Sequence, residues 1–455
     1  MAKPVKLGVI GAGSATFSLG LIRDICVRES LAGSHVTLMD LDEARVGTMG
    51  TFAKRYAAEM GASVTFEVTT DREACLREAD FVINTAQVGG HSSVEALRDW
   101  TESWGYYRGF RLDPALNIRL MLAVARDMER LCPDAWLIQA GNPVFEGCTA
   151  MSRETGIKVC GLCHGHFGYR ELAEGIGLDP DQTTALAVGF NHCIWLLRFE
   201  CNGEDALPRL RRWIDEEAEQ FWRDYDPRFS DNQMARAAVE LYRLTGLFPI
   251  GDTTRKGGWW FHTDLETKKK WYGERLGGFD SELGWAQYLA SLDRRVARIE
   301  AAATDESVRL VELFPPEPTG EQHFPLIEAL LHDKRTELQV NVPNKGAIDG
   351  IPDDVVVEVP ALCSAAGIEP RHIGRLPEQL MVNVLGPRLV EAERLISLAV
   401  RPDGRTLMAM ILDDHRTPSW ERAVEFYRAL LARPEFAELT AEMRATGRAP
   451  EFWLG

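Results

Sequence analysis

The chain has 455 residues, which is too long for one ordinary hydrophobic core, so two closely packed domains are expected. Hydrophobic residues make up 45% of the sequence and charged residues 26%, as in ordinary globular enzymes. The formal net charge of −17 argues against a nucleic-acid partner, because such binding needs a basic surface.

The first residues lead directly into an apolar stretch, Val5–Ile10, without the pattern of a signal peptide. No run of residues is long and apolar enough for a membrane span. The nine cysteines stand at irregular spacing, which fits reduced thiols better than a disulfide framework. We therefore expect a cytoplasmic protein without a membrane partner.

Short apolar runs alternate with amphipathic stretches through the first part of the chain. The expected strands are Val5–Ile10, His35–Met39, Val64–Val68, Asp80–Thr85, Trp136–Gln139 and Lys158–Leu162. The expected helices are Phe17–Arg28, Leu41–Met60, Arg72–Arg77, Ala115–Leu131 and Phe145–Thr155. This alternation predicts an α/β fold with a doubly wound parallel sheet of the Rossmann type.

After Arg198 the pattern changes to long polar helices and motif-rich loops. Helices are expected at Ala206–Asp224, Asp231–Leu244 and Leu283–Ala302, and strands at Leu338–Val342 and Val355–Val359. From Pro370 onward the pattern predicts helices broken by Pro387, Pro402 and Pro418. We expect a Rossmann domain over residues 1–195 and an α+β domain for substrate binding and oligomerisation over residues 196–455.

A glycine-rich turn, Gly11-Ala12-Gly13, follows the first strand and opens a helix through Ser14 and Ala15. Glycines let the backbone approach a pyrophosphate, and the helix N-terminus supplies N–H groups. Thr16 replaces the usual third glycine, so the turn alone also fits a purely structural role. Asp40 ends the second strand, where an acid accepts from ribose hydroxyls and favours NAD over its phosphorylated form.

Two further strand ends carry asparagines. Asn84 closes the fourth strand, and Asn142-Pro143 follows the fifth. Ligands bind at the carboxyl ends of parallel strands, so we expect Asn84 to contact the cofactor and Asn142 to lie near a ligand. Asn142-Pro143 also fits a plain turn.

Cys163 and His192, each beside glycine or a small polar residue, are candidate metal ligands. A thiolate and an imidazole make half a metal site and leave positions open for a substrate. Each residue alone also fits a packing role, because a lone Cys is usually a small buried side chain. Cys160 falls inside a strand and is expected in the core. Rival ligands on the same grounds are His164, His166 and Cys193.

The stretch from Gly251 to His262 gathers an acid, two cations and an imidazole among aromatic residues. Aromatic faces suit sugar rings, while Arg and Lys suit carboxylate, sulfonate or phosphate groups. We therefore expect Asp252, Arg255, Lys256 and His262 to take part in substrate binding or catalysis. The following cations, Lys268–Lys270, are expected on a solvated helix.

Taken in order, these residues resemble glycoside hydrolase family 4, the NAD- and divalent-metal-dependent glycosidases. The matching signatures are Gly11-Ala12-Gly13-Ser14, Gly141-Asn142-Pro143, Gly161-Leu162-Cys163-His164-Gly165, Gly189-Phe190-Asn191-His192 and Asn341-Val342-Pro343-Asn344-Lys345-Gly346. The resemblance runs from Lys6 to about Pro360 and fades beyond. Within the family, the stretches 249–253 and 264–273 are most similar to α-glucuronidases and metal-dependent α-glucosidases, which take unphosphorylated sugars.

The resemblance implies a fold like lactate and malate dehydrogenases, a homodimer or homotetramer, and Mn²⁺ as the metal. It also implies cleavage by transient oxidation at C3 of the sugar, proton abstraction at C2, elimination of the aglycone and addition of water. Cys163 and His192 then match the metal ligands, Asn142 a contact to a substrate hydroxyl, and Asp252 the base. The acid loop of many relatives is glycine-rich, unlike residues 106–113 here, so Asp113 is taken as the acid and Tyr107 as its alternative.

The sequence thus predicts an α-glycosidase with bound NAD, with α-glucuronidase as the leading specificity and a uronide as the small-molecule substrate. Arg255 and Lys256, near His262, would pair with the uronate carboxylate. Other glycosidase specificities, α-glucosidase or α-galacturonidase, stay open. Two other classes are also compatible: a dehydrogenase that consumes NAD, and a redox-sensing Rossmann protein with Cys163 as its thiol.

Overall fold

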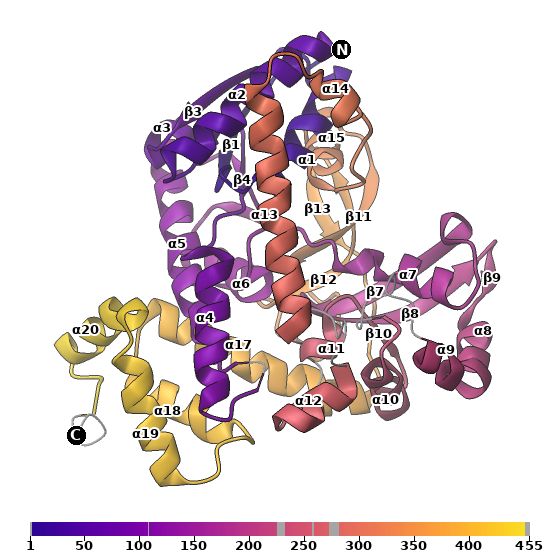
Figure 1. Ribbon diagram of the computed structural model, residues 1–455, viewed down its shortest axis with the longest axis vertical. Helices are drawn as coiled ribbons and strands as arrows, with labels where there is room; N and C mark the ends of the chain where they lie inside the picture. The colour runs from indigo at the N-terminus through magenta and orange to yellow at the C-terminus, as the bar shows by residue number, and fades with distance from the viewer. Residues whose placement is uncertain (1, 108, 225–232, 257–258, 273–281, 451–455) are drawn as a thin grey trace.

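The computed structural model describes residues 2–107, 109–224, 233–256, 259–272 and 282–450 (Figure 1). One sheet of thirteen strands runs through these residues. Its parallel half has the order β3-β2-β1-β4-β5-β6, which confirms the Rossmann-type prediction. These strands are β1 (Lys6–Ile10), β2 (His35–Met39), β3 (Thr65–Thr69), β4 (Phe81–Asn84), β5 (Trp136–Gln139) and β6 (Lys158–Gly161).

Helices cover both faces of the parallel half, so the inner strands, such as β1 and β4, are buried almost along their whole length, while the edge strand β3 is partly exposed. The helices are α1 (Ala15–Cys26), α2 (Glu43–Met60), α3 (Arg72–Leu76), α4 (Gly90–Ser103), α5 (Asp113–Leu131) and α6 (Val144–Glu154). All but α4 lie within a few residues of the predicted positions. Helix α4 was missed although its apolar residues follow a helical period, because it begins at Gly89-Gly90, a turn signal, and its first turn is polar.

The second half of the sheet is antiparallel and continues the first through the pairing of β6 with β11. Its order onward is β11-β12-β7-β8-β10, with β13 beside β12 and β9 beside β8. The strands are β7 (Thr183–Phe190), β8 (Cys193–Cys201), β9 (Glu204–Asp205), β10 (Phe248–Ile250), β11 (Thr336–Pro343), β12 (Val356–Ser364) and β13 (Gly367–Pro370). The two predicted strands of this half are therefore present, while the β7–β8 hairpin was not predicted.

The helices of the second half are α7 (Gly168–Gly175), α8 (Leu207–Arg212), α9 (Ala218–Asp224), α10 (Arg236–Thr245), α11 (Thr253–Lys256), α12 (Leu265–Tyr272), α13 (Glu282–Thr304), α14 (Leu310–Leu313) and α15 (His323–His332). The long helices predicted for the second half are present, as α8 with α9, α10 and α13, whereas α7, α11, α14 and α15 were not predicted. A π-helical turn, Trp213–Glu217, joins α8 to α9. The predicted start of the helix at Asp231 lies outside the described residues.

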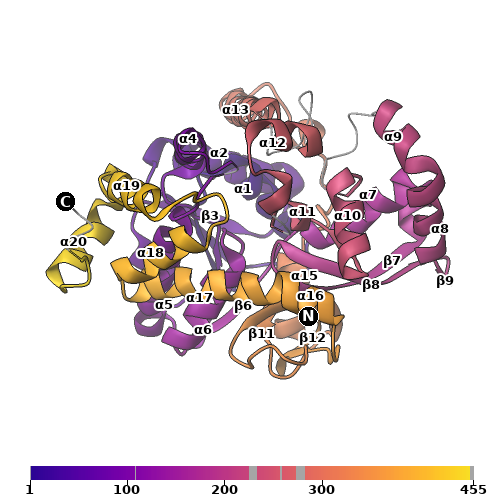
Figure 2. The same cartoon turned by 90° about the horizontal axis from the view of Figure 1, so that it is seen from below.

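The C-terminal segment is helical and binds the two halves together. It comprises α16 (Glu378–Leu380), a π-helical turn (Met381–Leu385), α17 (Gly386–Val400), α18 (Gly404–Asp413), α19 (Trp420–Leu431) and α20 (Ala437–Ala445). Helix α17 packs on α5 and α6 while α16 reaches α10, as Figure 2 shows from below. The prediction that Pro387 breaks a helix is wrong, because Pro387 lies in the first turn of α17, where its missing N–H costs little.

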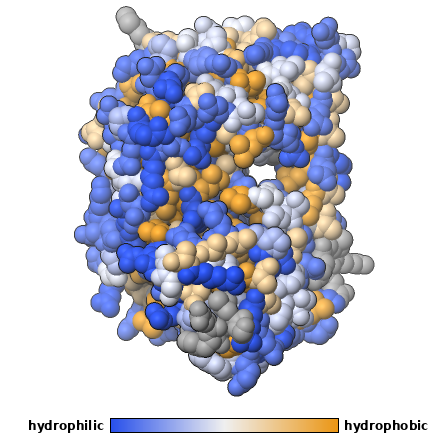
Figure 3. Space-filling view, turned by 90° about the vertical axis from the view of Figure 1, so that its left-hand side faces the viewer, coloured by the Kyte–Doolittle hydropathy of each residue, from blue (hydrophilic) through white to orange (hydrophobic). Residues whose placement is uncertain are grey.

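The surface view in Figure 3 is mostly hydrophilic, with apolar residues in smaller groups. Among the described residues, no helix combines the length and the apolar character that a membrane crossing needs. The domain boundary at residue 195 stays a prediction, since one sheet continues across it.

Candidate active site

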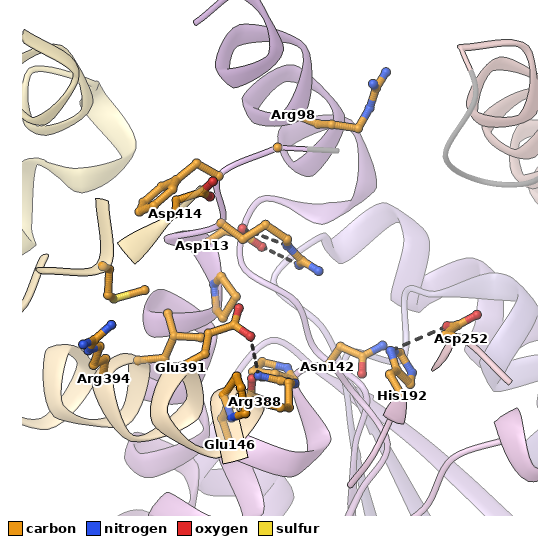
Figure 4. Close-up of a pocket in the computed structure, with 18 of the residues that line it drawn as sticks. Arg98, Asp113, Asn142, Glu146, His192, Asp252, Arg388, Glu391, Arg394 and Asp414 are labelled. Carbon is orange, nitrogen blue, oxygen red and sulfur yellow. Dashed lines mark hydrogen bonds and ion pairs between the residues drawn. The ribbon is translucent and has the colours of Figure 1, made fainter. Parts of the chain in front are cut away.

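A cavity of about 1020 Å³ opens beside the carboxyl ends of the parallel strands. It is lined by α4, α5, the loop after β5, the β7–β8 hairpin, the segment after β10, and α17 with α18. Five of the predicted site residues line it: Asp113, Asn142, His192, Asp252 and His262. Figure 4 shows Asn142, His192 and Asp252 side by side at one end of this cavity.

His192 is placed by the tip of the β7–β8 hairpin. Phe190 pairs with Cys193 across the hairpin, so Asn191 and His192 form a two-residue connection. The backbone of His192 has φ 59°, a left-handed conformation that residues other than glycine rarely adopt and that often marks functional sites. Its Nδ1 lies 3.5 Å from Oδ2 of Asp252, which joins the hairpin to the segment after β10.

Cys163 lies in the loop after β6, and close packing of two glycines brings this loop to Asp252. The Gly165 N–H donates to Sγ of Cys163 at 3.5 Å. Gly251 has φ 61°, and a Cβ there would lie 2.8 Å from the Gly165 carbonyl oxygen. Only glycine at position 251 therefore lets the two loops meet.

A buried carboxylate, Glu358 on β12, lies behind this cluster. Asn191 donates from Nδ2 to Oε2 of Glu358 at 2.9 Å, and its side chain also hydrogen-bonds Cys163. Burial raises the pKa of Glu358 to about 7, although neighbouring amides lower it. Burial, followed by the charge of Glu358, raises the pKa of the Cys163 thiol to about 12.

The donor set at this point fits a divalent metal. Cys163 supplies sulfur and His192 nitrogen, and two protein ligands leave several positions open for substrate oxygens. Within the described ranges, no group of three or more His, Cys, Asp or Glu residues is arranged to hold an ion by itself. The raised thiol pKa means that metal binding would release a proton from Cys163.

The other candidate metal ligands make contacts of their own or lie in the core. His164 is exposed and lies 2.9 Å from Glu321, whose hydrogen bond raises the pKa of His164. The His166 ring lies 3.0 Å from the Cys163 carbonyl oxygen, and burial lowers its pKa to about 4. Cys193 is fully buried in the core, as is Cys160, in line with the expectation for Cys160. None of these four residues lines the cavity, and neither does Cys163 itself, which lies behind the wall next to Asn191 and Asp252.

The glycine-rich turn has the geometry of a dinucleotide site. The Gly13 N–H donates to Oδ2 of Asp40 at 2.8 Å, and a Cβ at Gly13 would lie 2.8 Å from that carboxylate. Helix α1 begins after Ser14 without a side-chain cap, so its first N–H groups point to the turn. The side chain of Ala15 lies outside the described residues, and the predicted contacts of Gly11 and Ser14 stay predictions.

Asn84 supports the neighbouring loop after β4 from the interior. It is fully buried, donates to Gln139 at 2.9 Å and accepts from the Ala86 N–H at 3.2 Å. The side chain therefore shapes the loop after β4, and its predicted contact with the cofactor itself stays untested.

The two candidates for the acid differ in position. Asp113 begins α5, lines the cavity and is paired with Arg111, whose Nη2 lies 2.9 Å from Oδ2 (Figure 4). Tyr107 is not among the lining residues, and its carbonyl accepts from Arg416. Position in the cavity therefore favours Asp113.

The opposite wall was missed by the sequence analysis. It consists of buried ion pairs: Arg388 with Glu146 at 2.6 Å and with Glu391 at 3.0 Å, and Arg416 with Asp414 at 2.6 Å. Figure 4 shows Arg388 and Glu146 beneath Asn142. Arg388 and Glu146 are 242 residues apart, so nothing in the sequence indicated that they meet; the other two pairs are local, but no pattern placed them on the cavity wall.

The expectation of a solvated helix at 268–270 is wrong for Lys268. Its side chain is 1% exposed, and its Nζ lies 3.0 Å from Oε1 of Glu102 on α4. Glu102 also pairs with Arg98 at 2.7 Å. This pairing connects α12 to α4 at the edge of the cavity.

Replacing Lys268 by methionine is expected to lower the free energy of unfolding by roughly 3 kcal/mol, because it leaves a buried carboxylate short of one partner. Arg98 still pairs with Glu102, so the loss should lie at the low end of the roughly 3–5 kcal/mol that removing one partner of a buried ion pair costs. Equilibrium unfolding in urea measures this change in the free energy of unfolding. Lys270→Met is the control, since Lys270 is exposed on the same helix and should change stability by less than about 0.5 kcal/mol.

Arg255 and Lys256 belong to α11, directly after Asp252, but their side chains lie outside the described residues. The predicted pairing of these cations with a carboxylate is therefore still a prediction. His262 is buried, with 6% exposure, and lines the cavity.

The comparisons with known proteins give a consistent result. Residues 6–178 match the family model of the family 4 glycosyl hydrolases, and residues 187–417 match that of the C-terminal domain of this family. The match therefore extends past Pro360, where the resemblance was expected to fade.

Two curated relatives cover most of the chain. An α-galactosidase of Bacillus subtilis (strain 168) is 28% identical, over 82% of this chain and 85% of that protein. An α-galacturonidase of Thermoanaerobacterium saccharolyticum is 26% identical, over 94% of this chain and 95% of that protein.

Two solved structures share the fold. A putative glucosidase, lplD, from Bacillus subtilis has a TM-score of 0.79 at 20% identity, covering 94% of this chain and 100% of that one. A 6-phospho-α-glucosidase from gut microorganisms, in complex with NAD and Mn²⁺, has a TM-score of 0.76 at 18% identity, covering 94% and 98%.

Proposed function

This chain belongs to the family 4 glycosyl hydrolases, and we propose that it is an α-glycosidase of uronides that works with bound NAD and a divalent metal, Mn²⁺. The observation that carries the proposal is the meeting of Cys163, His192 and Asp252 in one cavity-side cluster. Family membership speaks against the dehydrogenase and redox-sensor alternatives. A cytoplasmic location and a homodimeric or homotetrameric assembly stay predictions.

Both cofactors are supported by this chain's own residues and by a relative in the same fold. The turn at Gly11–Ser14 with Asp40 offers the backbone groups and the carboxylate that NAD needs. Cys163 and His192 would hold the metal. The 6-phospho-α-glucosidase with this fold was solved with NAD and Mn²⁺.

When bound, NAD⁺ would accept hydride from C3 of the sugar and return it later, while the divalent ion would act as a Lewis acid. Asp252 would take the proton from C2, and its contact with His192 keeps its carboxylate beside the metal ligands. Asn142 would hold a sugar hydroxyl. Asp113, across the cavity, would protonate the departing oxygen.

The choice of a uronide depends on where a free cation is available. The described arginines of the cavity wall are Arg98, Arg111, Arg388, Arg394 and Arg416, and each pairs with a carboxylate. A substrate carboxylate at this wall would meet an arginine that is already paired with a protein carboxylate. Arg255 and Lys256, next to Asp252 in sequence, are therefore our candidates for the uronate contact. The α-galacturonidase among the relatives is in keeping with a uronide substrate.

Arg255→Ala is expected to lower kcat/KM on a p-nitrophenyl α-uronide by about 10–150-fold, the equivalent of roughly 1.5–3 kcal/mol for a charge-assisted contact. Turnover of the matching neutral glycoside should change little. The measurement uses a panel of p-nitrophenyl α-glycosides with NAD⁺, Mn²⁺ and thiol present. Equal losses on charged and neutral sugars would exclude Arg255 as the uronate contact.

A further inference from the structure

The buried carboxylate of Glu358 has no role in the steps above, although it lies against the cluster that performs them. Glu358 is 1% exposed and sits on β12, opposite Gly189 of the hairpin strand that leads to His192. Burying a carboxylate without a counter-charge is costly, so such a group needs an explanation.

The surroundings of Glu358 lack the compensation that the other buried carboxylates have. Oε2 accepts from Asn191, while Oε1 has no partner in hydrogen-bonding geometry among the described residues; the side-chain amides of Asn341 and Gln339 lie close enough to lower the pKa of Glu358, but they bring no charge. No described Lys, Arg or His forms an ion pair with it. Glu146, buried to the same degree, is matched by Arg388.

The Asn191 side chain connects this carboxylate to both proposed metal ligands. It donates to Glu358, hydrogen-bonds Cys163, and directly precedes His192 in the two-residue turn. Fixing the Asn191 side chain therefore fixes the turn that presents His192. The hydrogen bond between the Asn191 side chain and Cys163 likewise holds the Cys163 sulfur in place.

We propose that Glu358 is a positioning residue of the metal site: its carboxylate orients Asn191, and through it Cys163 and His192. This inference rests on the proposed function, because it requires that Cys163 and His192 bind a metal. In many metal sites, residues outside the ligand set hydrogen-bond to the ligands and fix their orientation.

The test measures Mn²⁺ binding to the purified full-length protein under reducing conditions, by electron paramagnetic resonance of free Mn²⁺. Glu358→Gln and Asn191→Ala should each raise the Kd for Mn²⁺ by about 10–100-fold, the usual effect of losing such a partner. Glu358→Asp, which keeps the carboxylate, should recover part of the affinity. Thermal stability and the Kd for NAD⁺ are measured on the same samples and should stay near the wild-type values.

Glu328→Gln is the matched control. Glu328 is a largely buried carboxylate on α15 that pairs with Arg28, and its loss should leave the Kd for Mn²⁺ unchanged. Wild-type affinity for Mn²⁺ in folded Glu358→Gln or in folded Asn191→Ala would overturn the proposal. If Glu358→Gln does not fold, Asn191→Ala alone decides. Absence of Mn²⁺ binding in the wild-type protein would instead contradict the proposed function.

Discussion

Cys163→Ala is expected to abolish most of the hydrolytic activity, with kcat/KM falling about a thousandfold or more. The expectation follows from the several kcal/mol that a Lewis-acid metal contributes to stabilising charge in a transition state. Cys163 is the sulfur donor of the cluster, and its hydrogen bonds from Gly165 and Asn191 hold it there. The measurement is the initial rate on a p-nitrophenyl α-glycoside at saturating NAD⁺ and Mn²⁺.

The comparison with Cys160→Ala separates metal binding from loss of packing. Cys160 is fully buried in the strand before the loop, so its replacement should lower stability but leave the folded enzyme active. Addition of a chelator to the wild-type enzyme should reproduce the Cys163→Ala effect, and Mn²⁺ should reverse it. A Cys163→Ala enzyme that keeps wild-type activity and Mn²⁺ dependence would exclude this thiol as a ligand.

Asp252→Asn is expected to lower kcat by about 10²–10⁴-fold, the usual contribution of a general base. The amide keeps the size of the side chain but cannot accept the C2 proton. Binding of NAD⁺ should be unaffected, because Asp252 follows β10, at the far end of the sheet order from β1, which leads into the glycine-rich turn. Rapid-mixing kinetics on the same glycoside measures kcat.

Asp264→Asn is the control for this change. Asp264 is an exposed carboxylate whose pKa is lowered by hydrogen bonds from Thr267 at the start of α12, so its loss affects only that helix end. Its kcat should match that of the wild type. The kcat of Asp252→Asn could instead stay within about a few-fold of the wild-type value, as for a substitution of an exposed residue. That result would show that another group takes the C2 proton.

The parallel half of the fold could be predicted because its strands are buried on both faces and appear as continuous apolar runs. Ligands bind at the carboxyl ends of such strands, which is why Asn142, after β5, was expected near a ligand. The structure places Asn142, after β5, on the cavity wall beside His192.

The charged wall of the cavity and the burial of Lys268 could not be predicted in this way. Lys268 stands in a run of lysines that looks solvated, and its partner Glu102 lies 166 residues earlier. Arg388 and Glu146 are 242 residues apart. Such pairs depend on how α4, α12 and α17 pack, which no local pattern encodes.

The most direct test follows a substrate deuterated at the second carbon of the sugar, with mass spectrometry of the released sugar. If hydrolysis proceeds through oxidation and proton abstraction, the product should lose its label to the solvent, and in D₂O an unlabelled substrate should gain one deuterium. Products that keep the original label quantitatively would contradict transient oxidation beside Cys163 and His192.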